Sequence, residues 1–416
     1  MVTTTSVPAI PEAIPAWRAA FRRILGALTV ALFGAQVTTL ALPLIAAQTL
    51  SATPLQMGLL VAAGELPFLL CSLPCGVLVD RVRRWPLLIA ADLSRASLLL
   101  LIPLAALLGL LRLELVYLVA FLTGVGNVVF DVAHYAYIPA LVPRQDLVAA
   151  NGKIQVSYTA AESAGPGLAG VLIQAITAPF AILASAGSFL LSALLLGTAR
   201  ASEAPHRQAD LDLRQAIKAG LHAVLDHPLL RPIVLTSAVI GVCQYAVRAV
   251  YILYATRELG LNALQIGMIL AVGGLAAAPG GLLADRVAAR LGTGPAIWGG
   301  WLIEGAALLL LPLAVTLPAI PLLIVAQAIG GLAGTVANVN QWSLRQRVTP
   351  DHLQGRVTAS HRFLVYGAYP VGALLGGLLV TQIGMQPTLL LGALGATLCP
   401  LWLLRTPLRG KAMPPL

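Results

Sequence analysis

The chain has 416 residues, of which 58% are hydrophobic and only 10% are charged. This apolar content exceeds the roughly 45 to 50% of ordinary soluble domains, and apolar runs recur along the whole chain. The composition therefore excludes an ordinary soluble protein and indicates an all-α integral membrane protein. The net charge of +10 does not indicate nucleic-acid binding, because the basic residues lie in short segments between apolar runs.

A transmembrane helix needs about 20 apolar residues, and the chain offers twelve runs of that kind. We predict spans at 24–47, 55–79, 86–110, 115–141, 153–176, 180–199, 232–256, 263–284, 294–315, 320–343, 357–381 and 388–404. The first run is too long for the apolar core of a signal peptide and is followed by many similar runs. We therefore predict that it is retained as the first span.

Lysine and arginine predict how the spans are oriented. The odd-numbered connections carry only Arg112 and Arg257, whereas the even-numbered ones and the terminal regions carry most of the other basic residues. Basic residues concentrate in cytoplasmic connections, so both termini are expected in the cytoplasm.

The connection at 200–231 differs from the others because it is long and rich in charges. Leu213, Ile217, Leu221, Val224 and Leu225 recur in it at helical spacing, which predicts an amphipathic helix along the inner membrane surface. The expected organisation is a six-helix bundle at 1–199, this linker at 200–231 and a second six-helix bundle at 232–416.

Three sequence patterns recur in the same order in the two halves, at offsets of about 204 to 207 residues. The first is GVLVDRVRR at 76–84, which matches GLLADRVAAR at 281–290. The others pair 137–153 with 344–356 and 162–170 with 366–377. Parallel repeats around a site near the bilayer midplane are typical of secondary transporters.

These patterns resemble the major facilitator superfamily. Gly76-x-x-x-Asp80-Arg81 is similar to its signature loop between the second and third helices, and the pattern at 281–290 to the weaker second copy. Gly165-Pro166 with Gly170 resembles the Gly-Pro motif of its antiporters. FRRILG and QRVTPDHLQGRVTASHRF are most similar to the branch of bacterial macrolide-efflux and enterobactin-exporter-like proteins.

The resemblance implies a fold of twelve transmembrane helices in two pseudo-symmetric six-helix bundles. It also implies that the repeated loop is a cytoplasmic latch that stabilises the outward-facing state. The latch would consist of Gly76, Asp80, Arg81, Arg83, Arg84, Gly281, Asp285, Arg286 and Arg290. The alternative is that these charges only fix the topology.

The sequence departs from the family pattern in three places. Arg83 stands where the loop commonly has Gly, and Trp85 stands where it has a further basic residue. The fourth span lacks the Arg that another branch of drug antiporters carries there. Proton coupling through that Arg is therefore not transferred to this chain.

Ionisable groups inside a membrane cost on the order of 2.5 to 3.5 kcal/mol each and are candidates for function. Burial disfavours ionisation of a carboxyl group, which lets it bind and release a proton near neutral pH. The candidates for proton coupling are Glu65, Asp131, Glu162 and Glu304. A fifth carboxylate, Asp92, lies three residues before Arg95 and is expected to form a structural ion network instead.

Polar and aromatic residues share helix faces in several spans, and we predict that they line a substrate cavity. The candidates are Gln36, Asn127, His134, Tyr135, Tyr158, Gln244, Tyr245, Arg248, Tyr251, Asn338, Gln341 and Trp342. For any one of them, hydrogen bonding between helices is an equal alternative. Arg248 is expected to pair with Glu65 or Glu304.

The sequence thus predicts a proton-coupled exporter of drug-like or siderophore-like compounds in the bacterial inner membrane. A nutrient importer or facilitator of the same fold remains open, and an intramembrane enzyme or receptor is a remote alternative. We expect a monomer whose partners are a small molecule and the lipid bilayer. We expect neither a cofactor nor a metal site, because there is no Walker motif and the four cysteines lie inside apolar runs without CxxC spacing.

Overall fold

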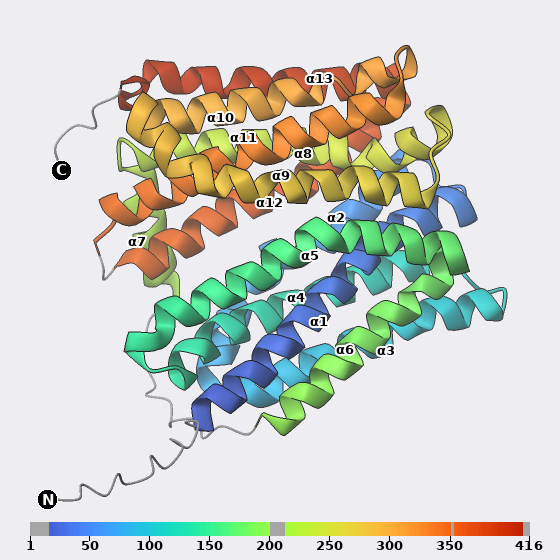
Figure 1. The fold of residues 1–416 in the computed structure, drawn as a ribbon, viewed down its shortest axis with the longest axis horizontal. Coiled ribbons are helices and arrows are strands. Elements are labelled where there is room, and N and C mark those ends of the chain that lie inside the picture. Colours follow the sequence, from blue (N-terminus) through green and yellow to red (C-terminus); the bar gives the residue numbers. More distant parts are fainter. Residues whose placement is uncertain (1–15, 200–212, 351–352, 411–416) are drawn as a thin grey trace, which may run out of the picture.

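The computed structural model describes residues 16–199, 213–350 and 353–410, and these residues form helices and short connections. Two stacked groups of long helices are visible in Figure 1. We call α1–α6 the N-bundle and α8–α13 the C-bundle.

The N-bundle consists of α1 (Ala16–Leu44), α2 (Pro54–Arg81), α3 (Arg84–Leu107), α4 (Leu113–Leu141), α5 (Leu147–Ile176) and α6 (Ala178–Thr198). The C-bundle consists of α8 (Leu230–Leu253), α9 (Ala263–Leu291), α10 (Thr293–Leu308), α11 (Ala319–Val348), α12 (Gln354–Ile383) and α13 (Met385–Leu398). Among the described helices, eleven are long and apolar enough to cross a membrane. The predicted span within α5 is not among the eleven, although α5 has 30 residues and packs along α1 and α9.

The helix predicted in the linker is α7 (Leu213–Leu225). One side of it packs on protein, because Val224 is buried in a cluster with Val357 and Val365 of α12. Gly220 is equally close to α12, since a Cβ there would lie 2.8 Å from the carbonyl oxygen of Arg356. The structure thus places α7 against α12, and its position along the membrane surface stays a prediction.

Matching structural details in the two bundles show the internal repeat. After α1 the chain forms a π-helix at Ile45–Thr49, and after α8 it forms another at Tyr254–Glu258. The following helices both begin with a capping box, made by Thr53 with Gln56 in α2 and by Asn262 with Gln265 in α9.

The two bundles are joined at the end that carries the π-helices, which we call the closed end. One hydrophobic cluster there contains residues of both bundles, among them Leu44, Ile45, Tyr254 and Ile266. The Arg257 guanidinium also donates to the carbonyl oxygen of Ala52, at 2.9 Å. α5 and α9 lie side by side at this interface (Figure 1).

Glycines allow the helices of the two bundles to come into contact at the closed end. A Cβ at Gly267 of α9 would lie 2.4 Å from the carbonyl oxygen of Pro166 and 2.9 Å from Cα of Gly170, both in α5. The matching contact joins α2 to α12, where a Cβ at Gly58 would lie 3.1 Å from Cα of Gly377. Only residues without side chains permit such close approach of two helices.

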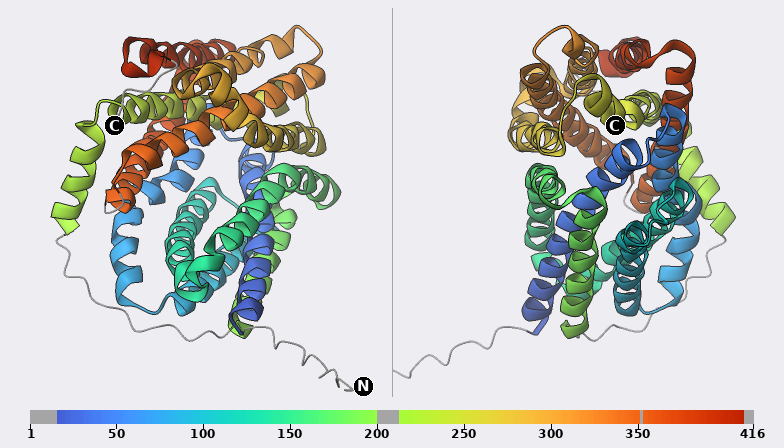
Figure 2. Two further views of the ribbon diagram at one scale, coloured as in Figure 1. Left: turned by 60° about the vertical axis from the view of Figure 1, so that its left-hand side comes forward. Right: turned by 90° about the vertical axis from the view of Figure 1, so that its right-hand side faces the viewer.

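At the opposite end, which we call the open end, the hydrophobic clusters do not bridge the bundles. One cluster there consists of N-bundle residues such as Phe21, Leu88 and Tyr137. The others consist of α7 and C-bundle residues such as Ile233 and Leu344. The bundles therefore separate toward this end, which the left view of Figure 2 turns toward the viewer.

Candidate functional site

A cavity of about 650 Å³ lies between the bundles, next to the closed end. Its walls come from α1, α2, α4 and Pro166 of α5 in the N-bundle, and from α8–α11 in the C-bundle. Pockets of a few hundred to about 1,000 Å³ are the size that holds drug-like ligands. A site shared by both bundles can change shape when the bundles move relative to each other.

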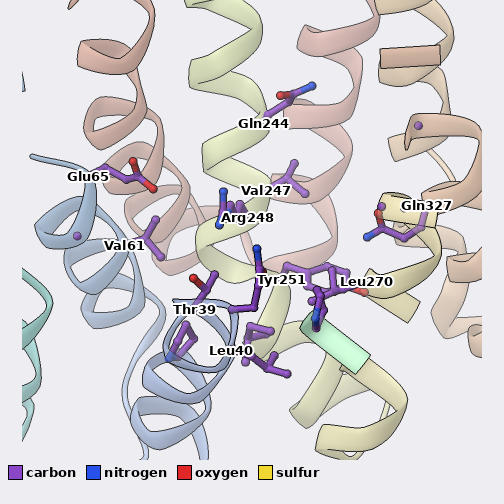
Figure 3. Close-up of a pocket in the computed structure, with 18 of the residues that line it drawn as sticks. Thr39, Leu40, Val61, Glu65, Gln244, Val247, Arg248, Tyr251, Leu270 and Gln327 are labelled. Carbon is purple, nitrogen blue, oxygen red and sulfur yellow. The ribbon is translucent and has the colours of Figure 1, made fainter. Parts of the chain in front are cut away.

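Many of the predicted cavity and proton-coupling residues do line this cavity. They are Gln36, Glu65, Asn127, Gln244, Arg248, Tyr251, Glu304 and Asn338. Figure 3 shows Gln244, Arg248 and Tyr251 along one helix, with Glu65 opposite them. The remaining lining is largely apolar and includes Leu40, Val61 and Leu270.

Glu65 and Arg248 are connected through a tyrosine. The Tyr245 hydroxyl of α8 donates to Oε1 of Glu65 at 3.1 Å and accepts from Nη1 of Arg248 at 3.1 Å. The predicted pairing of Arg248 with a carboxylate is therefore indirect in this structure. Because Glu65 belongs to the N-bundle and Tyr245 to the C-bundle, this hydrogen bond joins the two bundles at the cavity wall.

An aromatic array supports this tyrosine. The ring of Tyr245 stacks on that of Tyr369, with centroids 4.0 Å apart, and Tyr366 lies beside Tyr369. Tyr366 in turn meets Phe68 of α2 edge-on. Tyr366 and Tyr369 were not predicted as site residues from the sequence, although their spacing of three residues within the repeated 366–377 segment places them on one face of a helix.

Glu304 has a different environment from Glu65. It lies on α10 against α11, where a Cβ at Gly334 would be 2.6 Å from its Cδ. Among the described residues, no cation forms an ion pair with it. Glu304 is thus a carboxyl group at the cavity wall whose neighbours include the uncharged side chain of Gln244.

The other predicted site residues lie outside the cavity in this structure. His134 is buried in the N-bundle between Phe130 and Tyr135, and Gln341 is buried where its Nε2 donates to Nε2 of His361 at 2.9 Å. Asp131, Tyr135, Tyr158, Glu162, Tyr245 and Trp342 also do not line it. Sequence periodicity identified the polar faces of these helices but not how far along each helix the cavity extends.

The Gly-Pro segment of α5 serves packing on both of its sides. A Cβ at Gly165 would lie 2.4 Å from Cγ of Gln36, so α1 packs directly on this glycine. Gly170 makes the contact with α9 described above, and Pro166 reaches the cavity. This segment therefore links the cavity wall to the interface between the bundles.

The residues of the predicted latch lie at the open end. Arg81, Arg83, Asp285, Arg286 and Arg290 are exposed, and a Cβ at Gly76 would meet no atom within 4 Å. The Arg84 guanidinium donates to the carbonyl oxygen of Ala136 within the N-bundle, at 2.9 Å. No described neighbour therefore approaches α2 closely at Gly76 in this conformation.

Asp92 and Arg95 form the predicted structural ion pair, buried in the N-bundle. Ser192 donates to Oδ2 of Asp92 at 2.6 Å, and Nη1 of Arg95 donates to the Oδ1 of Asn127 at 2.9 Å. The Arg95 guanidinium also lies 4.3 Å from the ring of Phe189. These contacts fix the position of Asn127 at the cavity wall.

Replacing Asp92 by Asn should strongly destabilise the protein, because the buried Arg95 charge would lose the carboxylate that forms its ion pair. Breaking a buried pair in this way costs roughly 3 to 5 kcal/mol. Thermal unfolding in detergent should show a clearly lower midpoint. The control is Asp226→Asn in the exposed pair with His222, which should leave the midpoint nearly unchanged. Equal midpoints for the two variants would contradict a structural role of Asp92.

Two helical bundles of membrane-spanning length around a shared cavity define a membrane transporter. The sequence comparison then identifies the family: the Major Facilitator Superfamily model matches residues 24–369 and 249–415. The chain belongs to the Major Facilitator Superfamily.

Several known proteins are similar to this chain. The multidrug efflux pump Tap of Mycolicibacterium fortuitum is 28% identical over 376 residues, which cover 86% of this chain and 88% of Tap. The uncharacterized MFS-type transporter YfiS of Bacillus subtilis is also 28% identical, over 52% of each chain.

Two solved structures share the fold at low identity. A bacterial homologue of the lysosomal transporter Spinster, in an inward-facing and unoccupied conformation, has a TM-score of 0.72 at 15% identity, covering 97% of this chain and all of that one. A bacterial homologue of the iron transporter ferroportin, in an inward-facing state, has a TM-score of 0.73 at 15% identity, covering 92% and 98%. At this identity the likeness concerns the fold alone.

Proposed function

We propose that the protein exports amphipathic, drug-like molecules in exchange for protons. The observation that carries this proposal is Glu304, a carboxyl group at the wall of the cavity without a cationic partner among the described residues. Such a group can be occupied either by a proton or by a positively charged substrate, and competition between the two couples their movements. The similarity to Tap, a multidrug efflux pump, supports export over import.

The cavity favours large amphipathic ligands over small polar ones. Its lining combines leucines and valines with a few polar groups, and it is shared between two bundles. A small sugar or ion would leave much of this apolar surface without contacts, whereas a drug-sized molecule would cover it. Siderophore-like compounds belong to the same range of size and polarity.

The proposed orientation places both termini and the open end in the cytoplasm. The cavity would then receive substrate from the cytoplasm in the conformation described here. The bundles at 1–199 and 232–416 would move as units, connected by the linker at 200–231, to open the opposite end in turn.

Reconstituted vesicles test this proposal. The purified protein in liposomes should move a lipophilic cationic dye against its gradient when a proton gradient is imposed, and dissipating that gradient should stop the movement. Dye movement that follows only its own gradient would show a facilitator and overturn the exporter. A panel of neutral, cationic and catechol-containing substrates would then define the substrate class.

The two copies of the latch should contribute unequally. The first copy has Arg81, Arg83 and Arg84, whereas the second has only Arg286 and Arg290. Closing the open end should therefore depend more on the first copy, and we expect Asp80→Asn to reduce dye export several times more than Asp285→Asn. Export rates of the two variants, corrected for the amount of protein in the membrane, check this. Equal losses would argue against the asymmetry.

A further inference from the structure

A second polar cluster lies between the cavity and the open end. It contains Asp131 and Tyr135 of α4, Arg345 of α11, and His361 and Arg362 of α12, and we call it the vestibule cluster. On α4 and α11 it begins about one and two turns beyond the cavity residues Asn127 and Asn338. It therefore lies on the proposed path into the cavity.

Two of the three guanidinium nitrogens of Arg345 in this cluster lack a hydrogen-bond partner among the described residues. Its Nε and Nη1 atoms are buried, and neither has a hydrogen-bond acceptor among the described residues. The nearest charged groups that act on it include Arg362, which repels it. Buried guanidinium donors are normally satisfied, because leaving them unpaired costs free energy.

Arg362 is the second guanidinium group of the vestibule cluster. It is exposed and extends from the C-bundle toward the N-bundle, where its Cζ lies 5.1 Å from the centroid of the Tyr135 ring. The Asp131 carboxylate attracts the Arg362 charge, but it also attracts the charge of Arg95. His361 accepts the hydrogen bond from Gln341 on Nε2, so its ring is neutral and adds no charge to the cluster.

The cluster thus has more positive than negative charge, in a part of the molecule that is partly shielded from water. Arginine side chains bind carboxylate and phosphate groups with two parallel hydrogen bonds, which gives strong and oriented contacts. Tyr135 and Tyr366 lie beside the two arginines and offer aromatic surface to the adjoining part of a ligand.

We propose that Arg345 and Arg362 form a subsite for the anionic group of an amphipathic molecule. The inference rests on the proposed transport function and extends it to zwitterionic and acidic substrates. Seven residues of α11 separate Asn338 from Arg345, a rise of about 10 Å. One drug-sized molecule can therefore place its body in the cavity and its carboxylate or phosphate in the vestibule. The phosphate of a lipid headgroup has the same chemistry and is the other source of such an anion.

Binding of a simple aromatic acid tests the subsite. Calorimetric titration of the full chain in a neutral detergent should give about tenfold tighter binding for 2-naphthoate than for the uncharged 2-naphthylmethanol. Arg345→Gln should remove this preference, and Arg345→Lys should retain part of it. The matched control is Arg347→Gln, an exposed arginine in the same last turn of α11, which should leave the preference unchanged. No preference in the unmodified protein, or an intact preference in Arg345→Gln, would overturn the proposal.

Thermal unfolding separates this role from a structural one. Arg345 has buried atoms without acceptors, so Arg345→Gln should leave the unfolding midpoint unchanged or raise it. A marked fall of the midpoint would show that the arginine stabilises the fold and would count against a ligand site. Repeating the titration in nanodiscs with and without phosphatidylglycerol distinguishes the two anion sources, because a headgroup in the subsite weakens naphthoate binding whereas a site reserved for soluble acids is unaffected.

The binding assay needs no proton gradient, so its failure is distinct from failure of the proposed function. Naphthoate preference without gradient-driven dye export would remove the exporter and leave the anion subsite. Dye export with no naphthoate preference would support the exporter and overturn the anion subsite. A third result, in which Arg345→Gln abolishes export of every dye while the preference persists, would assign the arginine to closing the open end and overturn the subsite.

Discussion

Replacing Glu304 by Gln is expected to reduce proton-driven export of a cationic dye to the level of vesicles without protein. Gln has nearly the same shape as Glu but binds no proton and carries no charge, so it retains the contact with Gly334 of α11 while removing the exchangeable group. Glu304 lines the cavity and has no cationic partner among the described residues, whereas the other carboxyl group there, Glu65, is connected to Arg248 through Tyr245. The measurement is dye efflux from liposomes after an imposed pH step.

Two comparisons make this result specific. Glu114→Gln changes an exposed carboxylate at the start of α4 and should leave efflux unchanged. Exchange of labelled for unlabelled neutral substrate at equal pH should survive in Glu304→Gln, because that process needs the cavity but not the proton. Full gradient-driven efflux in Glu304→Gln would exclude Glu304 as the proton carrier. Glu65, which the Tyr245 hydroxyl connects to Arg248, would then be the next candidate.

Replacing Gly267 by Val is the second change with a large expected effect. A Cβ at this position would lie 2.4 Å from the carbonyl oxygen of Pro166, which is backbone and cannot rotate away. Overpacking of this kind costs roughly 1 to 3 kcal/mol. In an equilibrium between two conformations, that is about a 5- to 150-fold shift away from the one with the closed end packed. Export should fall with it, since the cycle needs both conformations.

Distances between spin labels measure this shift directly. Labels at Leu110 and Leu317, exposed positions in the connections of the two bundles at the closed end, should move apart in Gly267→Val. Gly58→Val should have the same effect, because Gly58 makes the matching contact with α12. Gly187→Val serves as the control, since a Cβ there meets no atom within 4 Å. Unchanged distances in both interface variants would show that these glycines do not hold the closed end together.

Predictions from the sequence were most successful where they rested on periodicity and charge. The repeat of GVLVDRVRR as GLLADRVAAR indicated two related halves, and the matching π-helices and capping boxes after α1 and α8 agree with that duplication. The spacing of Asp92 and Arg95 on one helix face predicted their ion pair. In each case the groups belong to one helix or to adjacent helices, so local helix geometry determines where they lie relative to each other.

The cavity residues were predicted less completely. Asn127 and Tyr135 lie on one polar stripe of α4, but only Asn127 reaches the cavity, whereas Tyr135 meets Arg362 of the opposite bundle. Arg345, Tyr366 and Tyr369 were not selected at all, because basic residues near the end of a span are expected from topology alone and tyrosines are frequent at membrane interfaces. No one-dimensional pattern records which residues from distant helices meet.

The sequence by itself therefore determined the class of protein, its spans, its duplication and the polar face of each helix. These depend on hydrophobicity and on the 3.6-residue period, which are properties of consecutive residues. Only the tertiary structure decided which end of the molecule is closed, where along each polar stripe the cavity lies, and that Glu65, Tyr245 and Arg248 form one chain of hydrogen bonds. The physical reason is that close contacts set the depth at which two helices meet, as between Gly267 and Pro166 or between Gly58 and Gly377. Such a contact joins residues far apart in the sequence, so it forms only when both helices are folded and packed together.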